Sequence, residues 1–173
     1  MTNDVKLMLD RDQILKRGDE AAKALLGSLG SKLKAAMKSG GPENALEVCR
    51  QAAIPSTTNV SQRFKGLRIS RISTKPRNPA NAATVLDRMV LETWASKLAL
   101  GDETLTDVVH QNSGGKSVFF RPIRIKAVCL KCHGDSSQFS SGLSVKLAKF
   151  YPQDKATGYK LGELRGAFKV EFE

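Results

Sequence analysis

Apolar residues recur every three or four positions along the first part of the chain. This spacing predicts one or two α-helices between residues 5 and 38, because residues three and four apart lie on one side of a helix. "SGG" at 39–41 ends this element. Pro42 with Glu43 predicts the start of another helix, since proline is favoured at the first helical position and an acid in the first turn. We expect the second helix to run from about Pro42 to Ala53 and to stop before "IPSTTN". The apolar positions of the first element are Leu15, Ala22, Leu25, Leu26, Leu29, Leu33, Ala36 and Met37.

The middle of the chain changes to the period of a strand. In "KGLRISRIS", Leu67, Ile69 and Arg71 alternate with polar residues, which is typical of a strand. "KPRNPAN" (75–81) is rich in turn residues and predicts a connector. Helical spacing then returns from about Ala82 to Ala99, where one side carries Val85, Leu86, Met89, Val90, Trp94 and Leu98.

Two more strands are expected in the last third of the chain. "SVFFRPIRIKAV" (117–128) is one, and its Pro122 indicates a sheet edge or a bulge. The stretch before it, 101–117, is polar and is expected to be a loop. Helices first, and then strands around a helix, predict an α+β fold with an antiparallel sheet. The chain ends on "AFKVEFE", a strand whose apolar face is Phe168, Val170 and Phe172.

Composition limits the functional classes. A chain of 173 residues with 40% hydrophobic residues suits one domain with a helical extension. No run approaches the roughly 20 apolar residues of a membrane span, and the N-terminus lacks the apolar stretch of an export signal. The net charge is +11, and basic residues cluster in 63–77 and 116–131, where no acid occurs. Aromatic residues are few, at 6%, and no stacking or recognition-helix motif appears, so the evidence for nucleic-acid binding is weak. Solvated strand faces, a bound anion or an acidic partner protein explain the charge as well.

The stretch "VCLKCHGD" (128–135) carries the candidate chemistry, since Cys129, Cys132 and His133 form a Cys-x-x-Cys-His motif. A redox dithiol would favour a helix start in a βαβ unit, but here a strand precedes. A structural zinc site needs four ligands, and only Cys49 and His110 remain to complete it.

Covalent haem is the alternative that the spacing favours. Two thiols must each add to one vinyl group on the same porphyrin edge, and a gap of two residues lets one tight turn present both. The adjacent His133 would then bind the iron as an axial ligand. The two haem propionates need cationic partners. Arg71, Arg77 and Arg124 are candidates, and ordinary surface positions explain each of them equally well.

The second axial position of such an iron decides its function. The methionines lie on apolar helical stripes, where core packing is the usual role, and His110 lies in a polar stretch. Cys49 shares an apolar helix face with Ala45, Leu46 and Ala53, so it is either a buried thiol or a ligand. The full set of candidates is His110, Met8, Met37, Met89 and Cys49, or no protein ligand.

Several segments together resemble a known family. "GPENALEVC", "RISRISTKPRNPAN", "CLKCHG" and "YPQDKATGYKLGELRGAF" occur in the order found in the DUF3365, or Tll0287-like, haem-domain family. The resemblance runs from about residue 20 to 173 and implies a PAS-like antiparallel sheet with flanking helices. It divides the chain into an N-terminal helical extension (1–40) and a haem c-binding domain (41–173).

The resemblance also implies the site. It implies one haem c attached through Cys129 and Cys132, with His133 and Cys49 as the two axial ligands. It places Arg77 and Asn78 in the connector near the haem, and Tyr151 or Tyr159 in a loop that closes over the haem region.

The function expected from this resemblance is a redox or diatomic-gas sensor and not an enzyme. A thiolate ligand favours ferric iron, so reduction or protonation of the sulfur should release Cys49 and open a site for a gas. The alternative is a soluble low-potential electron-transfer cytochrome that docks on an acidic partner. Thioether haem is attached outside the reducing cytoplasm, so an exported location is expected, and the long N-terminal helix is a candidate homodimer surface.

Overall fold

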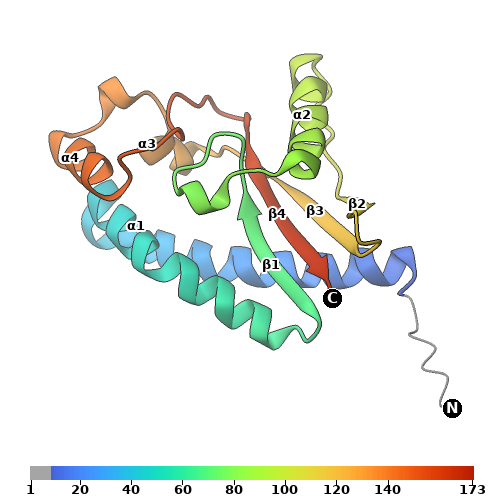
Figure 1. The fold of residues 1–173 in the computed structure, drawn as a ribbon. Helices are drawn as coiled ribbons and strands as arrows, with labels where there is room; N and C mark the ends of the chain where they lie inside the picture. The colour runs from blue at the N-terminus through green and yellow to red at the C-terminus, as the bar shows by residue number, and fades with distance from the viewer. Residues whose placement is uncertain (1–8) are drawn as a thin grey trace, which may run out of the picture.

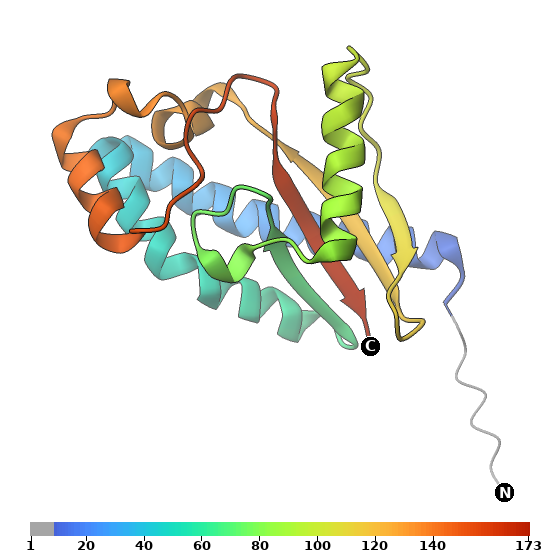
Figure 2. The ribbon, with the colours of Figure 1, turned by 45° about the horizontal axis from the view of Figure 1, so that its top comes forward.

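Four antiparallel strands form one sheet in the order β1–β4–β3–β2, with helices on both faces (Figures 1 and 2). The computed structural model describes residues 9–173. The chain therefore has the predicted α+β fold with an antiparallel sheet. Its elements are α1 (Arg11–Arg63), β1 (Leu67–Ile72), α2 (Val85–Ala99), β2 (Val108–Gln111), β3 (Ser117–Arg124), α3 (Leu130–His133), α4 (Ser141–Phe150) and β4 (Leu164–Phe172), with 3₁₀ turns at Pro79–Asn81, Ala127–Cys129 and Ser136–Gln138.

Helix α1 is broken where the sequence predicts a stop. Gly40 and Gly41 have non-helical backbone angles, and Gly41 has φ 66°, a conformation that glycine adopts without strain. The second half of α1 turns back beside the first half (Figures 1 and 2). The expected end near Ala53 is wrong, because the helix continues through Pro55 to Arg63. Ser56 and Val60 are buried beyond the proline, so packing outweighs the local helix-breaking tendency.

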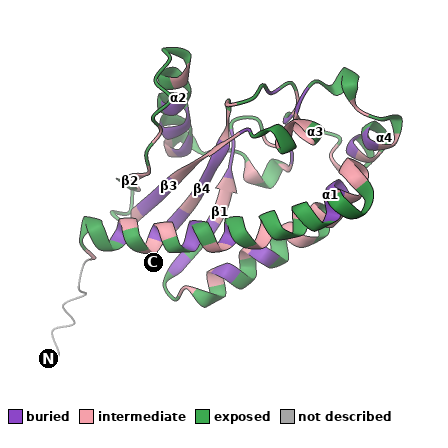
Figure 3. Cartoon of the chain, turned by 180° about the vertical axis from the view of Figure 1, so that it is seen from behind, coloured by how far each residue is buried: buried purple, intermediate pink, exposed green. Residues whose placement is uncertain are grey.

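Each face of the sheet has its own core (Figure 3). On the face that α1 covers, the helix contributes Ile14, Ala21, Ala22 and Leu25, so the first half of α1 packs on the sheet. On the other face, α2 contributes Val90, Leu91 and Trp94. The alternation expected for the last strand is confirmed, since Phe168, Val170 and Phe172 all join the α1-side core.

Two local expectations on the α2 side have different outcomes. The stretch 101–117 is not all loop, because β2 (Val108–Gln111) forms in it and pairs with β3. The expectation for Pro122 is confirmed. β2 pairs only with Ser117–Phe120, so β3 is a free edge beyond that point, and its register with β4 shifts at Ile123/Arg124.

Helix α4, which the sequence analysis did not predict, packs against the second half of α1. Leu143 and Leu147 form a small core with Leu46. Ser140 donates a hydrogen bond to Glu43 at 2.7 Å, and Lys146 pairs with Glu47 at 3.2 Å. These contacts hold the second half of α1 and α4 together. Within residues 9–173, no helix is both long and apolar enough to cross a membrane.

Replacing Gly18 by alanine should lower the free energy of unfolding by about 1–3 kcal/mol, because the added methyl would overlap the buried ring of Phe119. Gly27→Ala is the matched control on the same helix, since nothing lies within 4 Å of its new methyl. It should stabilise the protein by roughly 0.5–1 kcal/mol through helix propensity. Urea unfolding of both variants tests this, and equal stabilisation would show that α1 does not pack on Phe119.

Candidate functional site

The Cys-x-x-Cys-His motif forms a short turn at the end of the sheet where α1, α3 and α4 meet. Cys129 ends a 3₁₀ turn, and Cys132 and His133 lie in α3. The two half-buried thiols pack against different groups of residues. Cys129 packs with Ile125, Ala156 and Tyr159, whereas Cys132 packs with Leu46, Leu143 and Leu147. One short turn therefore carries both thiols, each packed against a different small cluster.

The imidazole of His133 is oriented by a main-chain carbonyl. Its Nδ1 lies 2.7 Å from the oxygen of Ala156, and because a carbonyl oxygen only accepts, Nδ1 carries the proton and donates. The other nitrogen, Nε2, is then unprotonated and available to a metal. Burial, together with the charges of Arg77, Arg165 and Arg71, lowers the pKa of His133 to about 3. The ring is therefore neutral at physiological pH.

Cys49 faces this turn from the second half of α1. Leu46, three residues earlier on the helix, packs in the same core as Cys132. Burial raises the pKa of the Cys49 thiol, and the positive charge of Arg71 acts in the opposite direction. Burial raises the pKa of the Cys132 thiol, the charge of Arg77 acts in the opposite direction, and Cys49 adds to the rise. Arg50 does not serve the thiol, because its guanidinium stacks 4.4 Å from the ring centroid of Phe150.

Among residues 9–173, Arg71 has no anionic partner. It extends from β1 into the space between Cys49 and Tyr151, whose charges both act on its pKa, which burial lowers. Within residues 9–173 its side chain makes no hydrogen bond or ion pair. A desolvated guanidinium of this kind is stabilised by a carboxylate.

The other predicted cofactor contacts from the basic segments are already engaged. Arg77 is buried and pairs with Asp154 at 3.0 Å. The side chain of Asn78 accepts a hydrogen bond from the main chain of Ala80 and caps its own turn. Arg124 donates to the carbonyl oxygen of Gly162 at 2.8 Å.

Both predicted tyrosines lie at the site. Tyr151 packs with Cys132, and the ring of Tyr159 meets His133 edge to face at 6.3 Å. Sequence reasoning missed Arg165, whose guanidinium lies 5.7 Å from the ring centroid of Tyr159. It also missed Ala156. An alanine and a single arginine at the start of a strand give no signal in sequence, because their roles depend on the fold.

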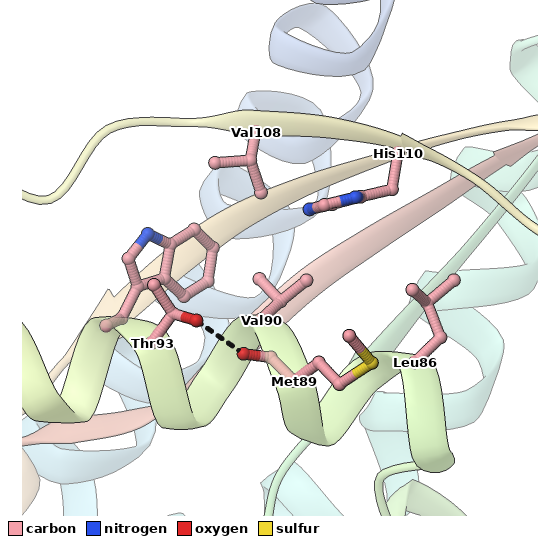
Figure 4. Close-up of a pocket in the computed structure, with 7 residues that line it drawn as sticks. Leu86, Met89, Val90, Thr93, Val108 and His110 are labelled. Carbon is pink, nitrogen blue, oxygen red and sulfur yellow. Dashed lines mark hydrogen bonds between the residues drawn. The ribbon is translucent and has the colours of Figure 1, made fainter.

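Two other candidates for an axial ligand, His110 and Met89, lie together in another part of the molecule. His110 and Met89 line a separate pocket of about 120 Å³ between α2 and β2 (Figure 4). His110 is exposed, as expected for a polar stretch, and its ring meets Phe120 edge to face. Met37 lies in the first half of α1, and Met8 lies outside the described residues.

The donors at the site fit an iron porphyrin. Two thiols, one neutral imidazole with Nε2 available, a third thiol on the neighbouring helix and one unpaired arginine are the groups that a covalent haem with its carboxylates would use. Across the described part of the chain, no three or more histidine, cysteine, aspartate or glutamate side chains gather in a group that could hold a metal ion.

A scan against family models gives a match to the Tll0287-like family over residues 6–172, nearly the whole chain. The chain belongs to the Tll0287-like family. The resemblance that the motifs indicate is thereby confirmed. Among solved structures, the chain is similar to the one described as the crystal structure of the cyanobacterial haem protein Tll0287. The two share 20% identity with a TM-score of 0.64, over 99% of this chain and 96% of the other. No curated protein matches the chain.

The polypeptide alone should become more stable as pH rises from about 3 to about 6.5. The pKa of His133 is about 3 in the folded chain and near 6.5 when unfolded, so the unfolded chain binds more protons in this window. Above about 6.5 this contribution is complete and the curve should flatten. His133→Gln should reduce the slope between about pH 4.5 and 6.5, measured by urea unfolding. An unchanged slope in the variant would mean that His133 is not buried as a neutral ring.

Proposed function

We propose that this chain binds one haem, attached covalently through Cys129 and Cys132, with His133 as an axial ligand. The observation that carries this proposal is the hydrogen bond from His133 to Ala156, which leaves Nε2 for iron directly beside two half-buried thiols. The description of a similar solved structure as a haem protein supports the same cofactor.

Cys49 is proposed as the second axial ligand. It lies on the helix that packs against Cys132, and the charge of Arg71 favours its thiolate. Arg71 also lacks a partner among residues 9–173, which suits a propionate. Arg77 and Arg124 are weaker candidates for the propionates, because their side chains already donate to protein groups. Asn78 is proposed to lie near the haem in the connector, where its side-chain oxygen caps its own turn.

The role proposed for this site is redox or diatomic-gas sensing. The haem supplies an iron that changes oxidation state and binds small gases. Cys49 acts as the displaceable group, since protonation of its sulfur removes the negative charge that holds it. Its helix begins after the break at Gly40–Gly41 and leads into β1 through Arg63 and Leu67. Movement of Cys49 would therefore be carried to the edge of the sheet.

Electron transfer is the second candidate, and a specific surface feature favours it. Main-chain hydrogen bonds join Lys155 to Pro76, Gly158 to Gly134 and Gly162 to Ile125, so these segments surround the Cys-x-x-Cys-His turn. They carry exposed lysines that suit an acidic redox partner. The lysines are Lys75, Lys126, Lys131, Lys155 and Lys160.

Two further proposals follow from covalent haem. A binding role, and not an enzymatic one, is proposed for the site. The protein is proposed to work in an exported compartment, where thioether haem is attached.

Replacing Cys129 and Cys132 together by alanine should abolish covalent haem while leaving the fold in place, because both thiols are only half buried. Co-expression with a haem-attachment system, followed by intact mass and haem staining of denatured protein, measures this. The parent should carry one haem per chain. A parent chain that matures without any covalent haem would contradict the proposed cofactor.

Cys49→Ala should remove the spectral features of thiolate ligation from the ferric protein and raise its midpoint potential. Loss of an anionic donor disfavours ferric iron, and axial ligands set haem potentials over a range of about 0.8 V. Arg50→Gln is the matched control, because this neighbour stacks on Phe150 instead of the thiol.

Comparison of the two oxidation states separates the two candidate roles. In a sensor, dithionite reduction of the parent should release Cys49 and allow carbon monoxide to bind rapidly. Retention of both ligands on reduction would favour the electron carrier. An unchanged ferric spectrum in Cys49→Ala would show that this thiol is a core residue.

A further inference from the structure

Arg77 lies in the connector after β1, yet all of its contacts are with distant segments. Its Nε donates to Asp154 at 3.0 Å. Its Nη2 donates to the carbonyl oxygen of Cys132 at 2.5 Å and to that of Ala156 at 3.3 Å. The side chains of Arg77 and Asp154 are only 10% and 11% exposed, which sets this pair apart from the solvated ion pairs of the surface.

The carbonyl of Ala156 is the acceptor that Arg77 shares with His133. Ala156 is fully buried, and both its N–H and its carbonyl oxygen take part in hydrogen bonds. Its N–H donates to Asp154 at 2.8 Å, and its oxygen accepts from both Arg77 and the imidazole. Arg77 and Asp154 therefore fix the position of the atom that orients the ring.

Main-chain hydrogen bonds join the same two segments. The N–H of Tyr159 donates to the carbonyl of His133 at 2.9 Å, and that of Gly158 donates to Gly134 at 2.8 Å. The N–H of Lys155 donates to Pro76, next to Arg77. The segment 154–159 thus lies along the Cys-x-x-Cys-His turn and is tied to it by the guanidinium at one end and by main-chain bonds at the other.

We propose that Arg77 and Asp154 are positioning residues for the axial histidine: together they hold the carbonyl of Ala156 where it fixes the tautomer and orientation of His133. This inference rests on the proposed function, since it assigns the residues that support the iron ligand. Arg77 then acts through Ala156, and not as a direct partner of a propionate. Its Nε and Nη2 are already used, whereas Arg71 is unpaired within residues 9–173.

The test uses the haem-attached protein in the ferrous state, with Arg77→Gln, Asp154→Asn and the double variant. In the ferrous state, where reduction is proposed to have released Cys49, acid titration followed by absorption reports loss of the histidine while the thioethers keep the haem in place. Removing a group that supports a ligand commonly costs 10–100-fold, so each single variant should raise the acid midpoint by about 1–2 pH units. The double variant should resemble the singles, because either substitution opens the same support.

A second readout is the iron–histidine stretching frequency in the Raman spectrum. It should fall in both single variants, because a weaker hydrogen bond from Nδ1 makes the imidazole a poorer donor. Arg121→Gln is the matched control. Like Arg77, Arg121 is an ion-paired arginine. It is partly buried, its partners are Asp19 and Asp107, and it lies on β3 away from the turn. It should lower thermal stability and leave both readouts unchanged.

Each alternative role gives a different result. Opposite shifts of the midpoint potential, down for Arg77→Gln and up for Asp154→Asn, with constant acid midpoints, would reduce the pair to an electrostatic role and overturn the proposal. Lower thermal stability with unchanged spectra, as in the control, would overturn it as well. An effect of Arg77→Gln alone would assign Arg77 to a propionate.

If either variant fails to mature, Arg77→Lys keeps the charge but cannot reach all three acceptors, and it should give the same shifts. A parent protein without haem would refute the proposed function itself, whereas haem-loaded variants with parent-like readouts refute only the positioning role.

Discussion

The hydrogen bond between His133 and the carbonyl of Ala156 is the contact on which the site depends. It selects the tautomer with the proton on Nδ1, which leaves Nε2 as the nitrogen available to a metal. Burial keeps the imidazole neutral, so no proton competes for Nε2 at physiological pH. Arg77 and Asp154 support that carbonyl, and Tyr159 lies beside the ring.

The two faces of the sheet differ in how they contribute to the position of Cys49. On one face the first half of α1 packs through small residues, and Gly18 allows the ring of Phe119 to approach the helix. This close packing fixes where α1 reaches its break at Gly40–Gly41. The second half of α1 then starts at a defined place beside α4 and carries Cys49 toward the Cys-x-x-Cys-His turn. The α2 face has no part in this arrangement.

The sequence predicts those features whose signal is local. The spacing of Cys129, Cys132 and His133 is visible in five residues, and the apolar face of Cys49 follows from its neighbours at three and four positions. The break in α1 follows from two glycines and a proline. The continuation through Pro55 could not be predicted, because burial of Val60 against the sheet decides it. β2 was also missed, since two half-buried and two exposed residues in a polar stretch become a strand only by pairing with β3. The contacts of Arg77 join segments 55 and 79 residues apart, so they could not be predicted from the sequence around Arg77.

The burial of the thiols has a consequence for how the chain matures. Cys49, Cys129 and Cys132 are all free and half buried in one site, which in an oxidising compartment invites a wrong disulfide. Disulfide formation needs a thiolate, and burial raises the pKa of Cys49 and of Cys132. The folded environment thus keeps two of its three sulfurs in the slow-reacting, protonated form. Burial thereby slows the pairing of these sulfurs into a disulfide before the proposed haem is attached.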